Sequence, residues 1–126
     1  MNTFLHSDLT DKILGCAVAV HRELGPGLSE YSYLTSLALE MPAKPLRFVQ
    51  EPALTVRFRD KVVGWHRPDF IVEGLVIVEL KAVSRFEPVF TKQVLTYLRV
   101  TGLKVGLLLN FNVPSMANDG IKRVAL

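Results

Sequence analysis

Hydrophobic residues change their spacing along the chain, and these changes divide it into predicted helices and strands. Near the N-terminus apolar residues recur every three or four positions, which predicts a helix that begins after Ser7-Asp8 and ends at residues 25–27. The apolar face of this helix consists of Leu9, Ile13, Ala17, Val20 and Leu24. A second helix with similar spacing is predicted from about residue 28 to residue 41.

From residue 46 onward the period becomes two, which is typical of strands. Residues 47–50, 54–59 and 62–65 are predicted strands, and the middle one alternates clearly between apolar and polar positions. This alternation predicts a sheet with one solvated side, and we expect Trp65 to pack in the core or within the hairpin. We also expect the next two strands to extend the same antiparallel meander.

A third helix and a returning strand are predicted in the C-terminal part. Pro88 suits the first turn of a helix that reaches residue 101, and Gly102 suits its C-terminal end. The apolar run at residues 104–111 predicts a strand that returns parallel to the strand before the helix. A short edge strand is predicted at residues 121–125. The order of elements therefore predicts a mixed α/β fold with two N-terminal helices, a mainly antiparallel meander and a crossover helix.

The strand predicted at residues 76–83 is apolar, yet it carries two charged side chains. Because side chains alternate along a strand, Glu79 and Lys81 project from one face and Val78 and Leu80 project from the other. An isolated ionised carboxylate in an apolar interior is very unfavourable, and even a paired one must recover a large desolvation penalty. A compensating partner is therefore expected.

Asp69 is the expected partner of Glu79, which it precedes by ten residues. If Glu73-Gly74 forms a tight turn, the flanking strands make a hairpin that brings Asp69 beside Glu79. Hard divalent cations prefer carboxylate oxygens, and a lysine ammonium can orient an attacking water or stabilise charge on a phosphate. We therefore expect Asp69 and Glu79 to bind Mg²⁺ or Mn²⁺ and Lys81 to assist the chemistry.

The order of these residues has a counterpart in a known superfamily. The pattern resembles the signature of the PD-(D/E)xK nucleases: it consists of Pro68-Asp69, nine intervening residues and then Glu79-Leu80-Lys81. The run at residues 20–33, with its Gly27, Glu30 and Tyr33, is similar to the GxxExxY protein family, which is placed in the same superfamily. The resemblance covers about residues 9–124. It implies a restriction-endonuclease-like core and a metal-dependent nuclease activity.

The resemblance implies roles for further residues. Glu30 corresponds to the N-terminal helical glutamate that joins the metal cluster, and Gln93 and Tyr97 match a Gln-x-x-x-Tyr element of exonuclease-like members. Because Gln93 and Tyr97 lie one helical turn apart, they share a face that could contact substrate or orient a metal ligand, or form a half-buried pair tied to the sheet. His21, by its place in the similar run, is a candidate to approach the site. His66 and Arg67 are candidates for phosphate contacts.

The composition fits one globular domain in the cytoplasm. The chain has 126 residues, of which 49% are hydrophobic and 21% are charged, as in ordinary soluble domains. No apolar stretch approaches the roughly 20 residues that span a bilayer, so we expect no membrane contact. Cys16 is the only cysteine, which excludes an intrachain disulfide and makes a zinc-thiolate site implausible. The net charge of +3 modestly favours nucleic acid as a ligand.

The leading hypothesis is a single nuclease domain, residues 1–126, that hydrolyses phosphodiester bonds in DNA or RNA with Mg²⁺ or Mn²⁺. One alternative is a catalytically inactive module of the same fold that binds nucleic acid or a protein partner. Another is a structural subunit that dimerises through a sheet edge, with the carboxylates only ion-paired. A homodimer or a protein partner is also compatible with a nuclease, because so small a domain offers little surface for sequence-specific recognition.

Overall fold

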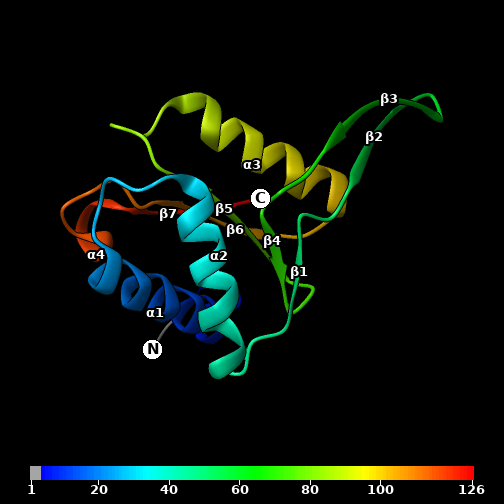
Figure 1. The fold of residues 1–126 in the computed structure, drawn as a ribbon. Coiled ribbons are helices and arrows are strands. Elements are labelled where there is room, and N and C mark those ends of the chain that lie inside the picture. The colour runs from blue at the N-terminus through cyan, green and yellow to red at the C-terminus, as the bar shows by residue number, and fades with distance from the viewer. Residues whose placement is uncertain (1–3) are drawn as a thin grey trace.

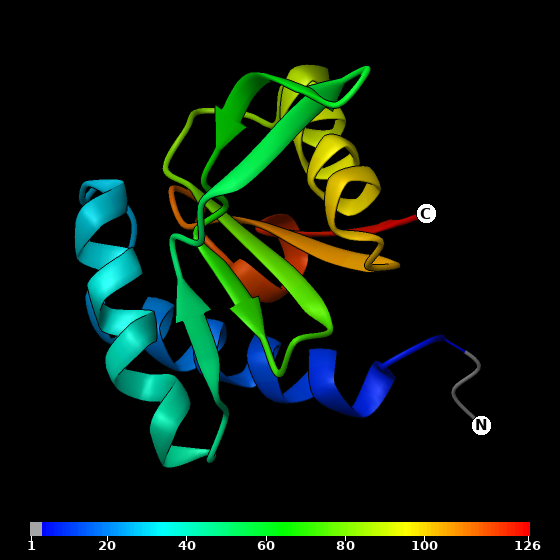
Figure 2. The same cartoon turned by 90° about the vertical axis from the view of Figure 1, so that its right-hand side faces the viewer.

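The computed structural model describes residues 4–126 and shows a sheet between two helical layers (Figures 1 and 2). One face of the sheet is covered by α1 (Ser7–Leu24) and α2 (Glu30–Glu40), and α2 continues into the short 3₁₀ helix η1 (Met41–Ala43). The other face is covered by α3 (Pro88–Thr101). The two predicted N-terminal helices and the predicted third helix are therefore confirmed. A further short helix, α4 (Met116–Asp119), precedes the last strand.

The central sheet has five strands in the order β1-β4-β5-β6-β7. The strands are β1 (Phe48–Gln50), β4 (Phe70–Val72), β5 (Val76–Lys81), β6 (Val105–Asn110) and β7 (Ile121–Ala125). β5 and β6 run parallel and are joined by α3, whereas the other neighbours are antiparallel. The predicted crossover and the predicted parallel return strand are confirmed, and the sheet is mixed.

The predicted meander is wrong in one respect. β2 (Leu54–Phe58) and β3 (Lys61–His66) form a separate two-stranded sheet, and β1 pairs directly with β4. The reason lies at Glu51, which has a φ of 52°, a left-handed conformation that turns the chain out of the sheet. The Glu51 N–H donates to the Asp69 carbonyl at 2.9 Å, and this hydrogen bond joins the two ends of the segment between β1 and β4. Residues 52–68 therefore project away from the sheet, as Figure 1 shows.

Side-chain exposure along this projecting hairpin also differs from the prediction. Leu54 packs against the apolar cluster under α3, but Phe58 is 59% exposed and Trp65 is 65% exposed. Apolar and polar residues do alternate along the hairpin, but no helix or sheet covers the apolar side chains of its outer part. Of the two expectations for Trp65, packing in the core is wrong, and Trp65 instead pairs with Thr55 within the hairpin.

The predicted turn between β4 and β5 is confirmed, and it positions β5. Glu73 and Gly74 have φ values of 52° and 67°, as the central residues of a tight hairpin require. β5 is buried on both faces, as expected for a strand with a parallel neighbour inside a sheet. Val78 and Leu80 face α1 and α2, whereas Ile77 faces α3. In residues 4–126 no helix is long and apolar enough to cross a membrane.

Candidate active site

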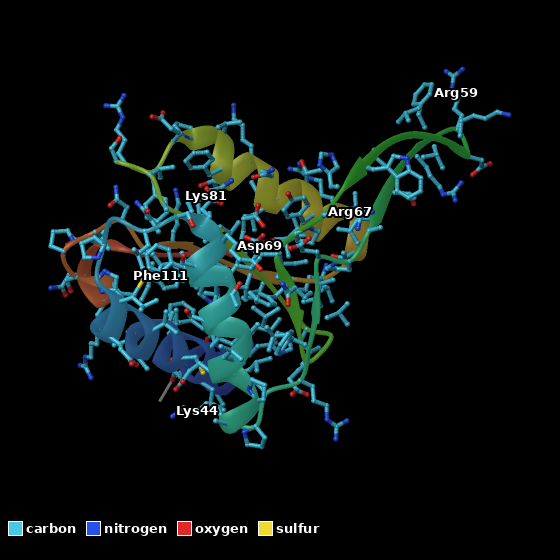
Figure 3. The ribbon with its side chains drawn as sticks, viewed as in Figure 1. Lys44, Arg59, Arg67, Asp69, Lys81 and Phe111 are labelled. Carbon is cyan, nitrogen blue, oxygen red and sulfur yellow. The ribbon has the colours of Figure 1, made fainter. Side chains whose placement is uncertain are left out.

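The candidate site lies where β4 begins and β5 ends, beside α3 (Figure 3). The hairpin brings Asp69 next to Glu79, as the sequence predicts. The Asp69 N–H donates to Oε1 of Glu79 at 3.0 Å, and the Leu80 N–H donates to Oδ2 of Asp69 at 2.7 Å. Each carboxylate is therefore held by the backbone of the other strand. This reciprocal arrangement fixes both side chains without a cation.

Burial raises the pKa of both carboxyl groups, and the charge of Asp69 adds to the rise at Glu79. Glu79 is only 5% exposed, and its burial, together with the negative charge of Asp69, raises the pKa of Glu79 to about 8. Burial also raises the pKa of Asp69, although the Leu80 N–H opposes this shift. The charge of Glu30 adds to the rise at Asp69. Both carboxyl groups are therefore harder to ionise than free ones.

Lys81 is the cation of this cluster. Its Nζ lies 3.8 Å from Oε2 of Glu79, donates to Oε1 of Gln93 at 3.3 Å, and sits 4.6 Å from the centre of the Phe90 ring. Gln93 and Phe90 both come from α3, so this helix holds the ammonium group over the end of β5. Lys81 therefore places one positive charge beside the two carboxyl groups.

Tyr97 completes the α3 side of the site. It is buried, and burial, the charges of Glu79 and Asp69, and a hydrogen bond to Glu79 all raise its pKa. Its ring also contacts the ring of His66, with centroids 5.7 Å apart. The structure therefore brings Asp69, Glu79, Lys81, Gln93 and Tyr97 together from β4, β5 and α3.

Glu30 lies at the margin of this cluster. It is the exposed first residue of α2, and the N-terminal end of α2 lies near the end of β5 (Figure 1). Glu30 affects the pKa of Asp69, which shows electrostatic contact across the site. Within residues 4–126, however, no three His, Cys, Asp or Glu side chains are close enough to hold one metal ion. The carboxyl groups of Asp69 and Glu79 therefore form the centre of the cluster, and Glu30 contributes charge from the exposed start of α2.

Tyr33 fixes the corner that precedes Glu30. Its hydroxyl donates to the Gly25 carbonyl at 2.6 Å and accepts from the Leu28 N–H at 3.1 Å. Its ring stacks on Phe111 with centroids 4.6 Å apart. Gly27 has a φ of 99°, a conformation that suits glycine. The Gly27, Glu30 and Tyr33 motif thus has a structural basis: two of its members build the turn that presents the third.

His21 lies elsewhere. Its Nε2 is 2.8 Å from the Val113 carbonyl oxygen, a hydrogen bond that ties the end of α1 to the loop after β6. Its ring centroid is 6.4 Å from that of Phe111. This contact gives His21 a packing role, and a role in catalysis or substrate binding stays a prediction.

Sequence reasoning missed the cavity beside Lys81. This cavity has a volume of about 420 Å³ and lies between α3 and the root of β3. Its lining consists of His66, Lys81, Val89, Phe90, Lys92, Gln93 and Thr96. Phe90 and Thr96 lie three positions before and after Gln93, so the helical spacing around Gln93 could have identified them.

Asn110 is a second missed residue. It is buried, its Oδ1 accepts from the backbone N–H groups of Val83 and Asn112 at 3.1 Å, and its Nδ2 donates to the Val83 carbonyl at 2.9 Å. Asn110 pairs with Lys81 in the parallel register of β5 and β6. It therefore fixes the chain just after Lys81. A polar residue at the end of an apolar strand was the available signal.

These features define a class of protein: a mixed α/β domain with paired carboxylates and a lysine at the end of its central hairpin. The family model of the PD-(D/E)XK nuclease superfamily matches residues 7–124. The chain therefore belongs to the PD-(D/E)XK nuclease superfamily. No curated protein and no solved structure matched the chain. Membership in the narrower GxxExxY family stays a prediction.

Proposed function

We propose that this protein is a metal-dependent nuclease that hydrolyses phosphodiester bonds in nucleic acid. The observation that carries the proposal is the reciprocal backbone clamp on Asp69 and Glu79, which holds two carboxylates together in a buried pocket. Nucleases of this superfamily generally use divalent metals, and nucleic acid is their ligand. The raised pKa of both carboxyl groups supports a site that gains stability when a cation binds.

The donor set of the pocket fits Mg²⁺ or Mn²⁺. Both ions favour oxygen ligands, and one or two carboxylates with water and substrate phosphate suffice for them. Asp69 and Glu79 would hold the ion, and the backbone bonds to Oδ2 of Asp69 and Oε1 of Glu79 leave the second oxygen of each without a backbone partner. Glu30 would reach it directly or through water. A bound ion would make water a stronger nucleophile and would neutralise charge on the scissile phosphate.

Lys81 and α3 supply the remaining chemistry. The ammonium group of Lys81 lies beside Glu79, where it can position the attacking water and stabilise negative charge that develops on the phosphate. Gln93 accepts a hydrogen bond from Lys81 and so restricts the position of the ammonium group. The hydrogen bond of Tyr97 to Glu79 restricts that carboxylate from the same helix. We therefore assign Gln93 and Tyr97 as positioning residues.

Cleavage assays with variants of the site test this proposal. Purified protein should cut DNA or RNA only with Mg²⁺ or Mn²⁺, and Asp69→Asn, Glu79→Gln and Lys81→Ala should each abolish cutting with the fold retained. Matched controls are Asp8→Asn, Glu23→Gln and Lys104→Ala, which change exposed residues outside the site. Metal-independent cutting, or equal cutting by the site variants, overturns the proposal. Nucleic-acid binding without cutting and without Mn²⁺ binding would instead identify an inactive module.

A further inference from the structure

The projecting hairpin carries a set of features that the site itself does not use. We call residues 54–67 the arm: it comprises β2, β3 and the segment that leads to Pro68. Four of the 15 basic residues and one of the 12 acidic residues lie in the arm, which gives it a net charge of +3. The remaining 11 basic and 11 acidic residues cancel. The net positive charge of the whole chain therefore corresponds to that of the arm.

The arm combines this charge with exposed aromatic surface. Trp65 pairs with Thr55, which lies two positions before Arg57 on β2, so Trp65 and Arg57 share one face of the hairpin. Phe58 and its partner Lys61 lie on the other face. At the tip, the Arg59 guanidinium lies 4.9 Å from the centre of the exposed Phe58 ring. Arg57, Arg59, Lys61 and Arg67 are all exposed. Exposed rings between cations are what a single-stranded nucleic acid requires, because unpaired bases stack on rings and phosphates pair with cations.

The root of the arm connects this surface to the candidate active site. Leu54 packs into the apolar cluster under α3, and the His66 ring contacts Tyr97. His66 also lines the cavity that Lys81 and Gln93 line from the other side. Figure 3 shows Arg59 at the tip of the arm, Arg67 at its root and Asp69 directly beyond. The arm and the cavity beside Lys81 therefore meet at His66.

We propose that the arm binds single-stranded nucleic acid, with Trp65 as a base-stacking platform and Arg57, Arg59 and Lys61 as phosphate contacts, and that it guides the strand to the site. This inference rests on the proposed function for the identity of the substrate and adds that the bound segment is unpaired. In a duplex the bases are stacked on each other and offer no face to Trp65.

A second copy of this chain is a less suitable occupant of the arm. Two arms that met face to face would bring two positively charged surfaces together, which is unfavourable. Exposed Lys and Arg side chains on a two-stranded sheet also oppose pairing with another strand edge. The charge of the arm thus favours a polyanion.

Trp65 provides a direct measurement because it is the only tryptophan in the chain. Its fluorescence should be quenched saturably by a single-stranded DNA or RNA 15-mer in EDTA, where metal-dependent cutting cannot occur. A duplex of the same sequence should quench it much less. Equal quenching by duplex and single strands, or no quenching by either single strand, overturns the proposal.

Fluorescence anisotropy with labelled 15-mers in EDTA measures the contribution of each group. Trp65→Ala should weaken binding by about 5- to 100-fold, and Trp65→Phe should restore most of it because a smaller ring still stacks. The triple variant Arg57→Ala/Arg59→Ala/Lys61→Ala should reduce the slope of log affinity against log salt by about 2, as expected for three lost phosphate contacts to a single strand.

Matched controls separate the arm from general effects. Tyr31→Ala removes an exposed ring on α2, and Lys12→Ala/Lys44→Ala/Lys104→Ala removes the same charge from exposed positions outside the arm. Both controls should bind within about twofold of the unaltered protein, with thermal melts that show folded variants throughout. Arm variants that bind like the controls overturn the proposal. A dimer in solution that Trp65→Ala converts to a monomer also overturns it, because the arm would then bind a second copy.

The metal-free design keeps this inference separate from the proposed nuclease activity. Protein that binds single strands through the arm but cuts nothing with Mg²⁺ or Mn²⁺ supports the arm and contradicts the nuclease. Protein that cuts, but whose arm variants bind single strands as well as the controls do, supports the nuclease and contradicts the arm.

Discussion

The end of β5 and the outer part of the arm depart from ordinary burial in opposite directions. At β5 a glutamate and a partly buried lysine lie inside the sheet, under α3 and beside a second carboxylate. On the arm, Trp65, Phe58 and Val63 lie in solvent. Burial of charge and exposure of large apolar groups both oppose stability, and they occur here in adjacent regions.

The two regions suit different functions, one chemical and one of ligand binding. Buried carboxylates interact strongly in a low-dielectric pocket and suit a metal ion and bond cleavage. Exposed rings and cations on a two-stranded sheet suit contact with an extended ligand but lack the enclosure that chemistry needs. We therefore assign catalysis to the β5 region and substrate binding to the arm, and the following variants test this division.

The largest expected effect concerns catalysis. Asp69→Asn should lower the turnover number by at least about 10³-fold, because a bound ion supplies several kcal/mol of transition-state stabilisation. Trp65→Ala should instead raise KM with a turnover number within a few fold of the unaltered protein, since binding and not chemistry is affected. Steady-state cleavage kinetics on a single-stranded substrate measure both. A fall in turnover of similar size in the two variants would contradict the assignment of catalysis to the β5 region and of binding to the arm.

Metal affinity should depend strongly on pH. The pKa of Glu79 is raised to about 8, so below pH 8 the metal must displace a proton, and Mn²⁺ affinity should fall by about tenfold per pH unit. Calorimetric titrations at pH 6, 7 and 8 measure this slope. Glu79→Gln should bind Mn²⁺ weakly and lose that slope. Equal affinity of the unaltered protein at pH 6 and pH 8 would contradict the assignment of Glu79 as a ligand.

Removal of the Tyr33 hydroxyl should destabilise the fold by about 1–2 kcal/mol, because it satisfies both the Gly25 carbonyl and the Leu28 N–H. Urea unfolding of Tyr33→Phe measures the loss. Tyr31→Phe is the matched control, since Tyr31 is exposed on the same helix and should unfold like the unaltered protein. Unaltered stability in Tyr33→Phe would show that the corner before Glu30 is held by other contacts.

Glu79→Gln should stabilise the metal-free protein at pH 8 by about 1 kcal/mol, because it removes a buried like charge and keeps an oxygen for the Asp69 N–H. The sign follows from the raised pKa of Glu79. Between pH 4.5 and about 8 the folded protein holds a proton that the unfolded chain releases, so the stability from Glu79 falls as pH rises. The gain should therefore shrink at pH 5. Thermal melts at both pH values, in EDTA, test it, and a loss of stability at pH 8 would contradict it.

The smallest expected effect is on the stability of the arm. Trp65→Ala should change the free energy of unfolding by less than about 0.5 kcal/mol, because most of the side chain is in solvent. Urea unfolding measures this value, and Leu54→Ala at the packed root of the arm should cost clearly more. A large loss in Trp65→Ala would show that the ring is structural, which would weaken its assignment to substrate binding.

The sequence alone predicted the centre of the site because that centre depends on local structure. Asp69 and Glu79 are joined by a short hairpin whose turn residues, Glu73 and Gly74, are recognisable, and the period of two places Glu79 and Lys81 on one face. The helix after them ends at a glycine with a φ of 77°, which the sequence also indicated. These features need no knowledge of distant pairing.

The remaining features depend on non-local contacts that the pattern does not encode. β1 pairs with β4 although the segment that contains the arm separates them in the sequence. The alternation of apolar and polar residues at positions 54–65 is the same whether these strands are covered by a second layer or project from the sheet. The exposure of Trp65 and the cavity between His66 and α3 follow from that pairing. The distance of Glu30 from the carboxylate pair likewise depends on how α2 packs.

The most direct test of the central claim is a crystal of the unaltered protein soaked in Mn²⁺ at pH 8 and measured at a wavelength where manganese scatters anomalously. We expect an anomalous peak between Asp69 and Glu79, with Glu30 within direct or water-mediated reach, and no such peak in Glu79→Gln. A fully soaked crystal with no manganese between these two carboxylates would contradict it.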